Sequence, residues 1–306
     1  MAAASRRGRL DLIDRAGCRL GAWIYRRDRS FGASLTSDPL PQVVRSTSAE
    51  VADLEPGVIH PVVASTPSGR LDAACLLHDW QGSRRPTVLF VHGSGETPFD
   101  AGGTPKGSFR NLLTRGRDLD VNVIAVRAPF HDGSQCGSKR ALAHLDNDVG
   151  MLAATTALLS ALTRQLRDEG CPAVHAVGIS LGGWVVNLHR DYHGDADHYV
   201  PMIAGTRPSA VFTTSIYRRL VAEETCQAPD QLRSILDVDD GFRASRTAPC
   251  APLLARYDRL VELEEQLPGC DGLDLRIIDK GHFTGMAATR ILRDHVHAAV
   301  GTATSR

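Results

Sequence analysis

Residues 173–184 read Ala-Val-His-Ala-Val-Gly-Ile-Ser-Leu-Gly-Gly-Trp, and this stretch decides the fold. An apolar run typical of a buried strand leads into a Gly-x-Ser-x-Gly pattern centred on Ser180, and residues compatible with a helix follow. The small residues Gly178 and Gly182 let neighbouring backbone pass close to a sharp, strained strand-to-helix turn. Such a turn holds the serine Oγ above the edge of a sheet, within reach of a base and of backbone N–H donors. The stretch therefore predicts that Ser180 is a nucleophile.

Strand and helix patterns alternate on both sides of this stretch. Two strands joined by a Pro-Ser-Gly turn at 67–69 predict an initial hairpin, and the later strands are apolar throughout, as in a parallel sheet covered on both faces. The expected strands are 58–64, 70–78, 87–92, 121–126, 198–204, 252–257 and 273–279, and the expected helices are 147–168, 181–189 and 283–300. The pattern indicates an α/β fold.

A candidate base follows the last expected strand. Gly281-His282 lies at the carboxyl end of that strand, where the catalytic groups of open parallel sheets gather. Four other histidines are expected on helices and not at the carboxyl end of a strand. His189 and His193 lie near the end of the helix after Ser180, and His295 and His297 lie on the terminal helix. We therefore expect His282 to be the base.

These features resemble the α/β-hydrolase superfamily. The resemblance covers residues 58–300 in five separated motifs, with the Gly-x-Ser-x-Gly pattern at the place of the family's nucleophile elbow. It implies an α/β-hydrolase fold with a mostly parallel central sheet of about eight strands, helices on both faces and a small helical cap. In this family the catalytic residues follow the order serine, acid, histidine along the chain, which is also the order of Ser180, Asp258 and His282.

The acid is expected from the resemblance to be Asp258. Residues 251–261 resemble the seventh strand and acid loop of the family, in which the Asp is followed three places later by Val, here Val261. The family's glycine three places before the acid is replaced by Ala255. Asp237, Asp239 and Asp240 are competing candidates, in an acidic run more typical of a solvated turn.

The oxyanion hole is formed by backbone N–H groups, so the sequence constrains only its position. One donor is expected to be the N–H of Leu181, directly after the serine. The His92-Gly93 pair resembles the family's His-Gly motif, and it places the second donor at the Ser94 N–H, with Gly93 as the alternative. Glu96 either lines the pocket or is exposed.

Two segments fall outside this common pattern. Residues 1–56 form an N-terminal extension of a helix and a Ser-, Thr- and Pro-containing linker, and residues 57–306 form the hydrolase domain. The extension could pack on the domain, mediate a homo-oligomer, bind a membrane surface or act as a transit peptide. Residues 205–249 exceed a simple crossover and are expected to be a cap insertion over the site, although a structural excursion without substrate contact is the alternative.

Composition excludes several other classes of protein. The 306 residues are 42% hydrophobic and 23% charged with zero formal net charge, which gives no reason to expect a nucleic acid or an anionic membrane as partner. The seven cysteines include no CxxC pair, which argues against a zinc site or a disulfide framework and favours a reducing cytoplasm. No apolar run reaches the roughly 18 residues of a membrane span, and no secretory signal is expected. The preference for Arg over Lys favours a GC-rich, bacterial source.

The expected activity is that of a serine hydrolase. The resemblance implies cleavage of a carboxylic ester of a small or acyl-chain substrate through an acyl-enzyme, without a metal or organic cofactor. Thioesterase or acyltransferase activity on the same three residues is an alternative. So is a non-catalytic protein that binds a small ligand, although such a protein has no need of all three groups.

Overall fold

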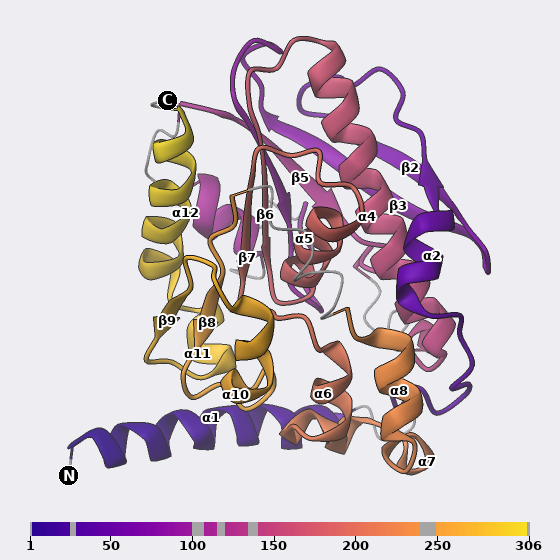
Figure 1. Cartoon of the computed structure of the whole chain (residues 1–306), viewed down its shortest axis with the longest axis vertical. Helices are drawn as coiled ribbons and strands as arrows, with labels where there is room; N and C mark the ends of the chain where they lie inside the picture. The colour runs from indigo at the N-terminus through magenta and orange to yellow at the C-terminus, as the bar shows by residue number, and fades with distance from the viewer. Residues whose placement is uncertain are drawn as a thin grey trace.

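The computed structural model describes residues 2–24, 29–99, 107–114, 120–133, 140–238 and 249–304. A nine-stranded sheet forms the centre, in the order β1–β2–β3–β5–β4–β6–β7–β8–β9 (Figure 1). The strands are β1 Ser48–Ala49, β2 Ile59–Thr66, β3 Gly69–Asp79, β4 Thr87–Val91, β5 Asn122–Arg127, β6 Val174–Ile179, β7 His198–Met202, β8 Leu253–Ala255 and β9 Arg276–Ile278.

The sheet is mostly parallel, as predicted. Strands β2 and β3 form the expected hairpin, β1 and β5 pair antiparallel with its two sides, and all pairs from β5 through β4 to β9 are parallel. The two-residue β1 is the strand that the sequence did not predict. Because the parallel strands end at one edge of the sheet, the loops that follow them meet there.

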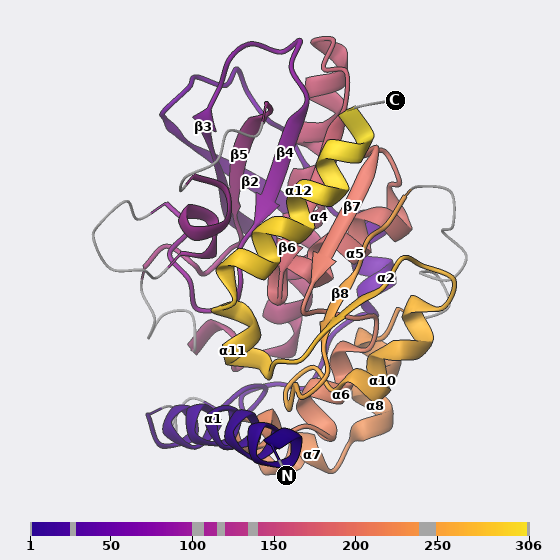
Figure 2. The same ribbon diagram turned by 90° about the vertical axis from the view of Figure 1, so that its left-hand side faces the viewer.

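Helices cover both faces of the sheet (Figure 2). The helices α2, α4 and α5 pack on one face, and α12 with the π-helical turn η1 packs on the other. Their bounds are α2 Leu40–Ser46, α4 Leu145–Asp168, α5 Leu181–Tyr192, α12 Thr289–Thr304 and η1 Arg110–Thr114. The short helices near the edge are α6 Pro208–Thr213, η2 Ile216–Leu220, α7 Glu223–Cys226, α8 Pro229–Leu236, α10 Leu263–Gln266, η3 Leu267–Cys270 and α11 His282–Met286.

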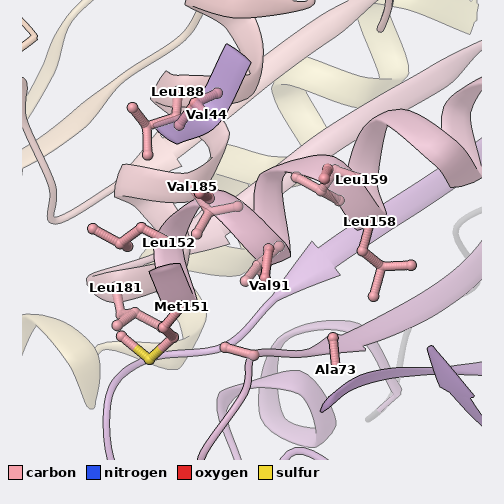
Figure 3. Packing of buried hydrophobic residues seen from close by; sticks show 14 of the residues in the cluster. Val44, Ala73, Val91, Met151, Leu152, Leu158, Leu159, Leu181, Val185 and Leu188 are labelled. Atoms are coloured by element: carbon pink, nitrogen blue, oxygen red, sulfur yellow. The ribbon is translucent and has the colours of Figure 1, made fainter. Parts of the chain in front are cut away.

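The largest hydrophobic core lies between the sheet and helices α2, α4 and α5. Every residue of β4 and β6 is buried, which explains why these strands are apolar without alternation, apart from the buried Thr87 and His175. Figure 3 shows side chains of α4 and α5 in one cluster with Val91 of β4 and Val44 of α2, which lies beside Leu188; the other labelled members from these two helices are Met151, Leu152, Leu158, Leu159, Leu181 and Val185. This packing holds the amino end of α5, and with it the turn at Ser180, against the sheet.

Residues 40–49 differ from the linker that the sequence predicted. They form α2 and β1, and Leu40, Val43 and Val44 are buried in the main core. Pro41 reads as a helix breaker in the sequence, but the first turn of a helix tolerates proline because its N–H groups have no intrahelical partner. This part of the extension therefore belongs to the folded body.

The N-terminal helix α1, Ala2–Ile24, lies across one end of the molecule beside the short helical segments (Figures 1 and 2). The expected terminal helix 283–300 is two helices, α11 and α12, with Ala287 and Ala288 between them. Within the described ranges, no helix is both long enough and apolar enough to cross a membrane.

Candidate active site

The predicted strained turn is present at Ser180. Its φ of 54° and ψ of −116° are unusual for a residue with a side chain, and the chain turns at this residue from β6 into α5. A Cβ on Gly178 would lie 2.2 Å from the Gly182 carbonyl oxygen, and one on Gly182 would lie 2.1 Å from the Val91 carbonyl oxygen. Both glycines are required because backbone passes at these positions, as the sequence pattern predicted.

We expect Gly182→Ala to lower the free energy of unfolding by roughly 1 to 3 kcal/mol, because the new methyl group must displace the backbone of β4. Urea denaturation measures this loss. Gly301→Ala is the matched control, since a Cβ there meets no atom within 4 Å and alanine favours the helix. Equal stability of the two variants would contradict the close packing of the turn.

The ends of four parallel strands, two on each side of β7, bring the candidate residues together. The loop with Ser94 follows β4, Ser180 follows β6, Asp258 follows β8 and His282 follows β9. Their registers align the strand ends, with Val91 opposite Gly178 and Ala255 opposite Ile278. Residues up to 188 positions apart in the sequence therefore meet at one edge of the sheet.

Ser180, His282 and Asp258 form a continuous hydrogen-bonded chain. Ser180 Oγ lies 3.3 Å from His282 Nε2, and His282 Nδ1 lies 2.7 Å from Asp258 Oδ2. The other carboxylate oxygen, Oδ1, accepts the backbone N–H groups of Leu260 and Val261, each at 2.8 Å. The Val261 that the sequence singled out therefore helps to orient the acid. The side chains of Asp258 and His282 are 1% and 8% exposed, so water competes little for these bonds.

Asp237, the one competing acid among the described residues, bonds elsewhere and not to His282. Asp237 accepts hydrogen bonds from the backbone N–H and the hydroxyl of Ser209, at 3.0 and 2.8 Å, and so holds the start of α6. Asp239 and Asp240 lie outside the described residues.

The surroundings of His282 favour its protonated form. Burial, the largest single influence, lowers the pKa of the imidazole, but the charge and hydrogen bond of Asp258 and the smaller effect of the Asp14 charge together outweigh it. The net pKa of His282 is raised above its ordinary value. A base with this environment accepts a proton from a serine hydroxyl more readily than a free imidazole does.

The loop after β4 is held by His92 and Glu96. His92 uses both ring nitrogens: Nδ1 donates to the Gly93 carbonyl at 2.7 Å, and Nε2 accepts the Ala128 N–H at 3.1 Å. Burial is the main reason that its pKa falls to about 3, so the ring is neutral, which suits this pair of bonds. His92 therefore stabilises the loop and is not available as a base.

Glu96 lines the cavity, which is the first of the two alternatives predicted from the sequence, and it also stabilises this loop. Its Oε2 accepts both the N–H and the hydroxyl of Ser108 at 2.7 Å, and its carboxylate accepts a further bond from the Gly93 backbone. Burial raises the pKa of Glu96 despite these bonds. The choice between the Ser94 and Gly93 N–H groups as the second oxyanion donor stays a prediction.

A cavity of about 450 Å³ opens over Ser180. Ser94, Leu181 and His282 border it at the sheet edge, and the segment 205–238 contributes apolar and aromatic side chains to its wall. The cavity-lining residues of that segment are Val211, Phe212, Tyr217 and Leu220. The segment has the short helices expected of a cap, whereas residues 239–248 lie outside the described ranges. Its extent as a cap insertion stays a prediction.

The N-terminal helix supplies a part of the site that sequence reasoning missed. Gly17, Cys18 and Gly21 of α1 line the cavity, and Asp14 is fully buried beside His282. In the sequence Asp14 appeared only as an acid among arginines, and no motif connects it with a histidine 268 positions later. Of the four alternatives for the N-terminal extension, the described structure shows the packing of α1 on the domain. A homo-oligomer through α1 stays a prediction.

In the part of the chain that the structure describes, no group of three or more His, Cys, Asp or Glu side chains could hold a metal ion. The described cysteines, Cys18, Cys75, Cys171, Cys226, Cys250 and Cys270, are free thiols, and Cys136 lies outside the described ranges.

The fold is that of known hydrolases. A Pyrococcus horikoshii acylaminoacyl peptidase superposes with a TM-score of 0.55 at 12% identity, over 80% of this chain and 42% of the peptidase chain. The Pyrococcus furiosus esterase Pf2001 matches with a TM-score of 0.51 at 17% identity, over 82% and 96%. Acetyl xylan esterase 1 from Thermoanaerobacterium matches with a TM-score of 0.51 at 11% identity, over 87% and 96%.

No protein-family model matches the sequence, and no curated protein matches it at a significant level. The likeness to solved structures therefore shows the fold alone. The α/β-hydrolase fold predicted from the sequence is confirmed. This chain spans less than half of the acylaminoacyl peptidase chain and nearly all of the two esterase chains.

Proposed function

We propose that this protein is a serine hydrolase that cleaves a carboxylic ester of a small or acyl-chain substrate through an acyl-enzyme. The observation that carries the proposal is the chain from Ser180 Oγ through His282 to Asp258 at the floor of a cavity. Nucleophilic attack by a neutral hydroxyl needs a base and an orienting group for that base, and both are within reach here.

In this mechanism His282 Nε2 takes the proton of Ser180 as Oγ attacks the ester carbonyl carbon. Asp258 holds the ring with Nδ1–H toward the carboxylate, which leaves Nε2 unprotonated and able to act as base. The imidazolium then gives its proton to the departing alkoxide oxygen, so the alcohol leaves and an acyl-enzyme remains. Water attacks the acyl carbon with the same imidazole as base, which releases the acid and restores the serine.

The developing negative charge on the carbonyl oxygen requires preorganised donors. We assign this role to the backbone N–H groups of Leu181 and Ser94, two residues that line the same cavity as Ser180. Each such donor is typically worth about 10² to 10³-fold in kcat.

Two features of the cavity support an acyl substrate. Its wall above the serine includes Phe212, Leu220 and Met286, and such side chains favour a hydrocarbon chain over a charged group. A volume of about 450 Å³ suits a small ester or an acyl chain of modest length. Two of the structurally similar proteins reported above are named as esterases, which also supports an ester substrate.

The test is labelling with a fluorophosphonate, followed by hydrolysis of p-nitrophenyl esters and acyl thioesters of increasing chain length. We expect covalent modification at Ser180 and turnover of the esters. Strong preference for thioesters would instead favour the thioesterase alternative. Folded protein that is neither labelled nor active on any of these compounds would contradict the hydrolase assignment and favour a ligand-binding protein.

A further inference from the structure

The buried carboxylate of Asp14 joins the N-terminal helix to the loops that carry the acid and the base. Asp14 Oδ2 accepts the N–H of His282 at 2.8 Å, and Oδ1 accepts the N–H of Phe283 at 3.2 Å. Oδ2 also accepts the N–H of Arg259, the residue after Asp258, at 3.2 Å. One side chain therefore binds the main chain of both loops.

The geometry of α11 explains why an acceptor is needed at this place. His282 and Phe283 are its first two residues, and their N–H groups have no partner inside the helix. The preceding residue is Gly281, which has no side chain with which to cap them. A Cβ at that position would lie 2.8 Å from Asp14 Oδ2, so the glycine also makes room for the carboxylate. Asp14 thus acts in place of the missing cap, from a segment remote in sequence.

The surroundings hold α1 in register for this contact. Gly17, one turn after Asp14, lies so close to the Phe283 ring that a Cβ there would be 2.4 Å from it. Cys18 is buried against Leu220 and Leu260. Burial of a carboxylate is costly unless its lone pairs are satisfied, so the three N–H bonds account for a carboxylate that is 0% exposed.

We propose that Asp14 is a positioning residue of the active site, which fixes the His282 loop and the Asp258 loop relative to each other and so places the imidazole against Ser180. The expected effect of Asp14 on catalysis rests on the proposed function. Its structural basis, the three backbone hydrogen bonds, is independent of the substrate.

The charge of Asp14 provides a readout that a purely structural role would not move. Two carboxylates raise the pKa of His282 against the effect of burial: Asp258, which is hydrogen-bonded to the ring, and Asp14 of α1, which acts through its charge alone. Removal of the Asp14 charge is therefore expected to lower this pKa. The acidic limb of the kcat/KM profile reports the protonation of the free base, so it should move to lower pH.

The experiment compares the full-length protein with Asp14→Asn, Asp14→Glu and the control Asp11→Asn. Asp11 lies on the same helix and carries the same charge, but it pairs with Arg15 and Arg259 at the half-exposed side of α1. NMR titration of the His282 ring, assigned with His282→Gln, gives its pKa without need of a substrate. Thermal unfolding checks that each variant is folded.

We expect Asp14→Asn to lower kcat by about tenfold to a hundredfold, as for a small displacement of a catalytic group, and to shift the His282 titration and the acidic limb together to lower pH. Asp14→Glu should keep the titration nearer that of the unmodified protein while kcat falls, because it keeps the charge and changes the length. If Asp14→Asn does not fold, the His282 titration of Asp14→Glu provides the test. A fall in the His282 pKa as large as that expected from loss of the charge would contradict the role of Asp14, because Asp14→Glu keeps the charge. Asp11→Asn should leave both values unchanged.

A His282 titration in Asp14→Asn equal to that of Asp11→Asn would overturn the inference. A protein that shows the titration shift but cleaves no ester and takes no label would contradict the proposed function alone, and the placement of His282 by Asp14 would stand.

Discussion

Replacement of Ser180 by alanine is expected to lower kcat/KM for a p-nitrophenyl ester by about 10⁴- to 10⁶-fold and to abolish labelling by a fluorophosphonate. The substitution removes the oxygen that lies 3.3 Å from His282 Nε2 and leaves the backbone donors of Leu181 and Ser94 in place. Any residual rate then reports oxyanion stabilisation and substrate binding without the nucleophile. Steady-state kinetics with mass spectrometry of the labelled protein measure both effects.

Ser46→Ala is the matched control for this experiment. Its hydroxyl lies on the exposed side of α2 and, among the described residues, bonds within its own helix to the carbonyls of Gln42 and Val43. We expect activity within twofold of the unmodified protein. If Ser180→Ala retained most of the activity while Ser46→Ala behaved as expected, another residue would have to be the nucleophile.

Asp258→Asn is expected to lower kcat by about 10⁴-fold while the protein stays folded. The reason lies in the hydrogen bonds of both carboxylate oxygens. Oδ1 accepts the N–H groups of Leu260 and Val261, so the amide oxygen of asparagine must take this place. Its NH₂ group then faces His282 Nδ1 and favours the tautomer with the proton on Nε2, which cannot accept the serine proton.

The same substitution at Asp237 separates the role of the acid from a general effect of lost charge. Asp237 holds Ser209 at the start of α6 and does not contact His282. We expect Asp237→Asn to keep kcat and to lower the free energy of unfolding by about 1 kcal/mol, as for a weakened cap. An Asp237 variant with the larger loss of kcat would reverse the assignment of the acid.

Most of the sheet and the main site geometry follow from local patterns. Buried parallel strands are short and apolar, so β4 and β6 are visible in the sequence, and the glycines around Ser180 mark a turn that no larger residue tolerates. His282 was predicted as the base from its place after the last strand, and Asp258 was predicted as the acid by resemblance. The structure places Asp258 Oδ2 2.7 Å from His282 Nδ1, which supports both proposed roles.

The weakest predictions concern segments whose conformation depends on tertiary contacts. Residues 40–46 have proline and few periodic positions, yet α2 forms because Leu40, Val43 and Val44 fill a gap beside α4 and α5. The break between α11 and α12 falls at two alanines, which individually favour a helix. In α2, packing overrides local propensity, whereas no contact among the described residues explains the break at the two alanines.

The sequence by itself determined the α/β alternation, the strained turn at Ser180 and the place of His282, because each depends on the steric demands of a few adjacent residues. Only the tertiary structure decided that α1 closes one side of the cavity and that Asp14 binds the main chain at His282. A hydrogen bond from a backbone N–H requires no particular side chain at the donor, so it leaves no pattern to find. The contact exists only because the folded sheet brings residue 282 beside residue 14.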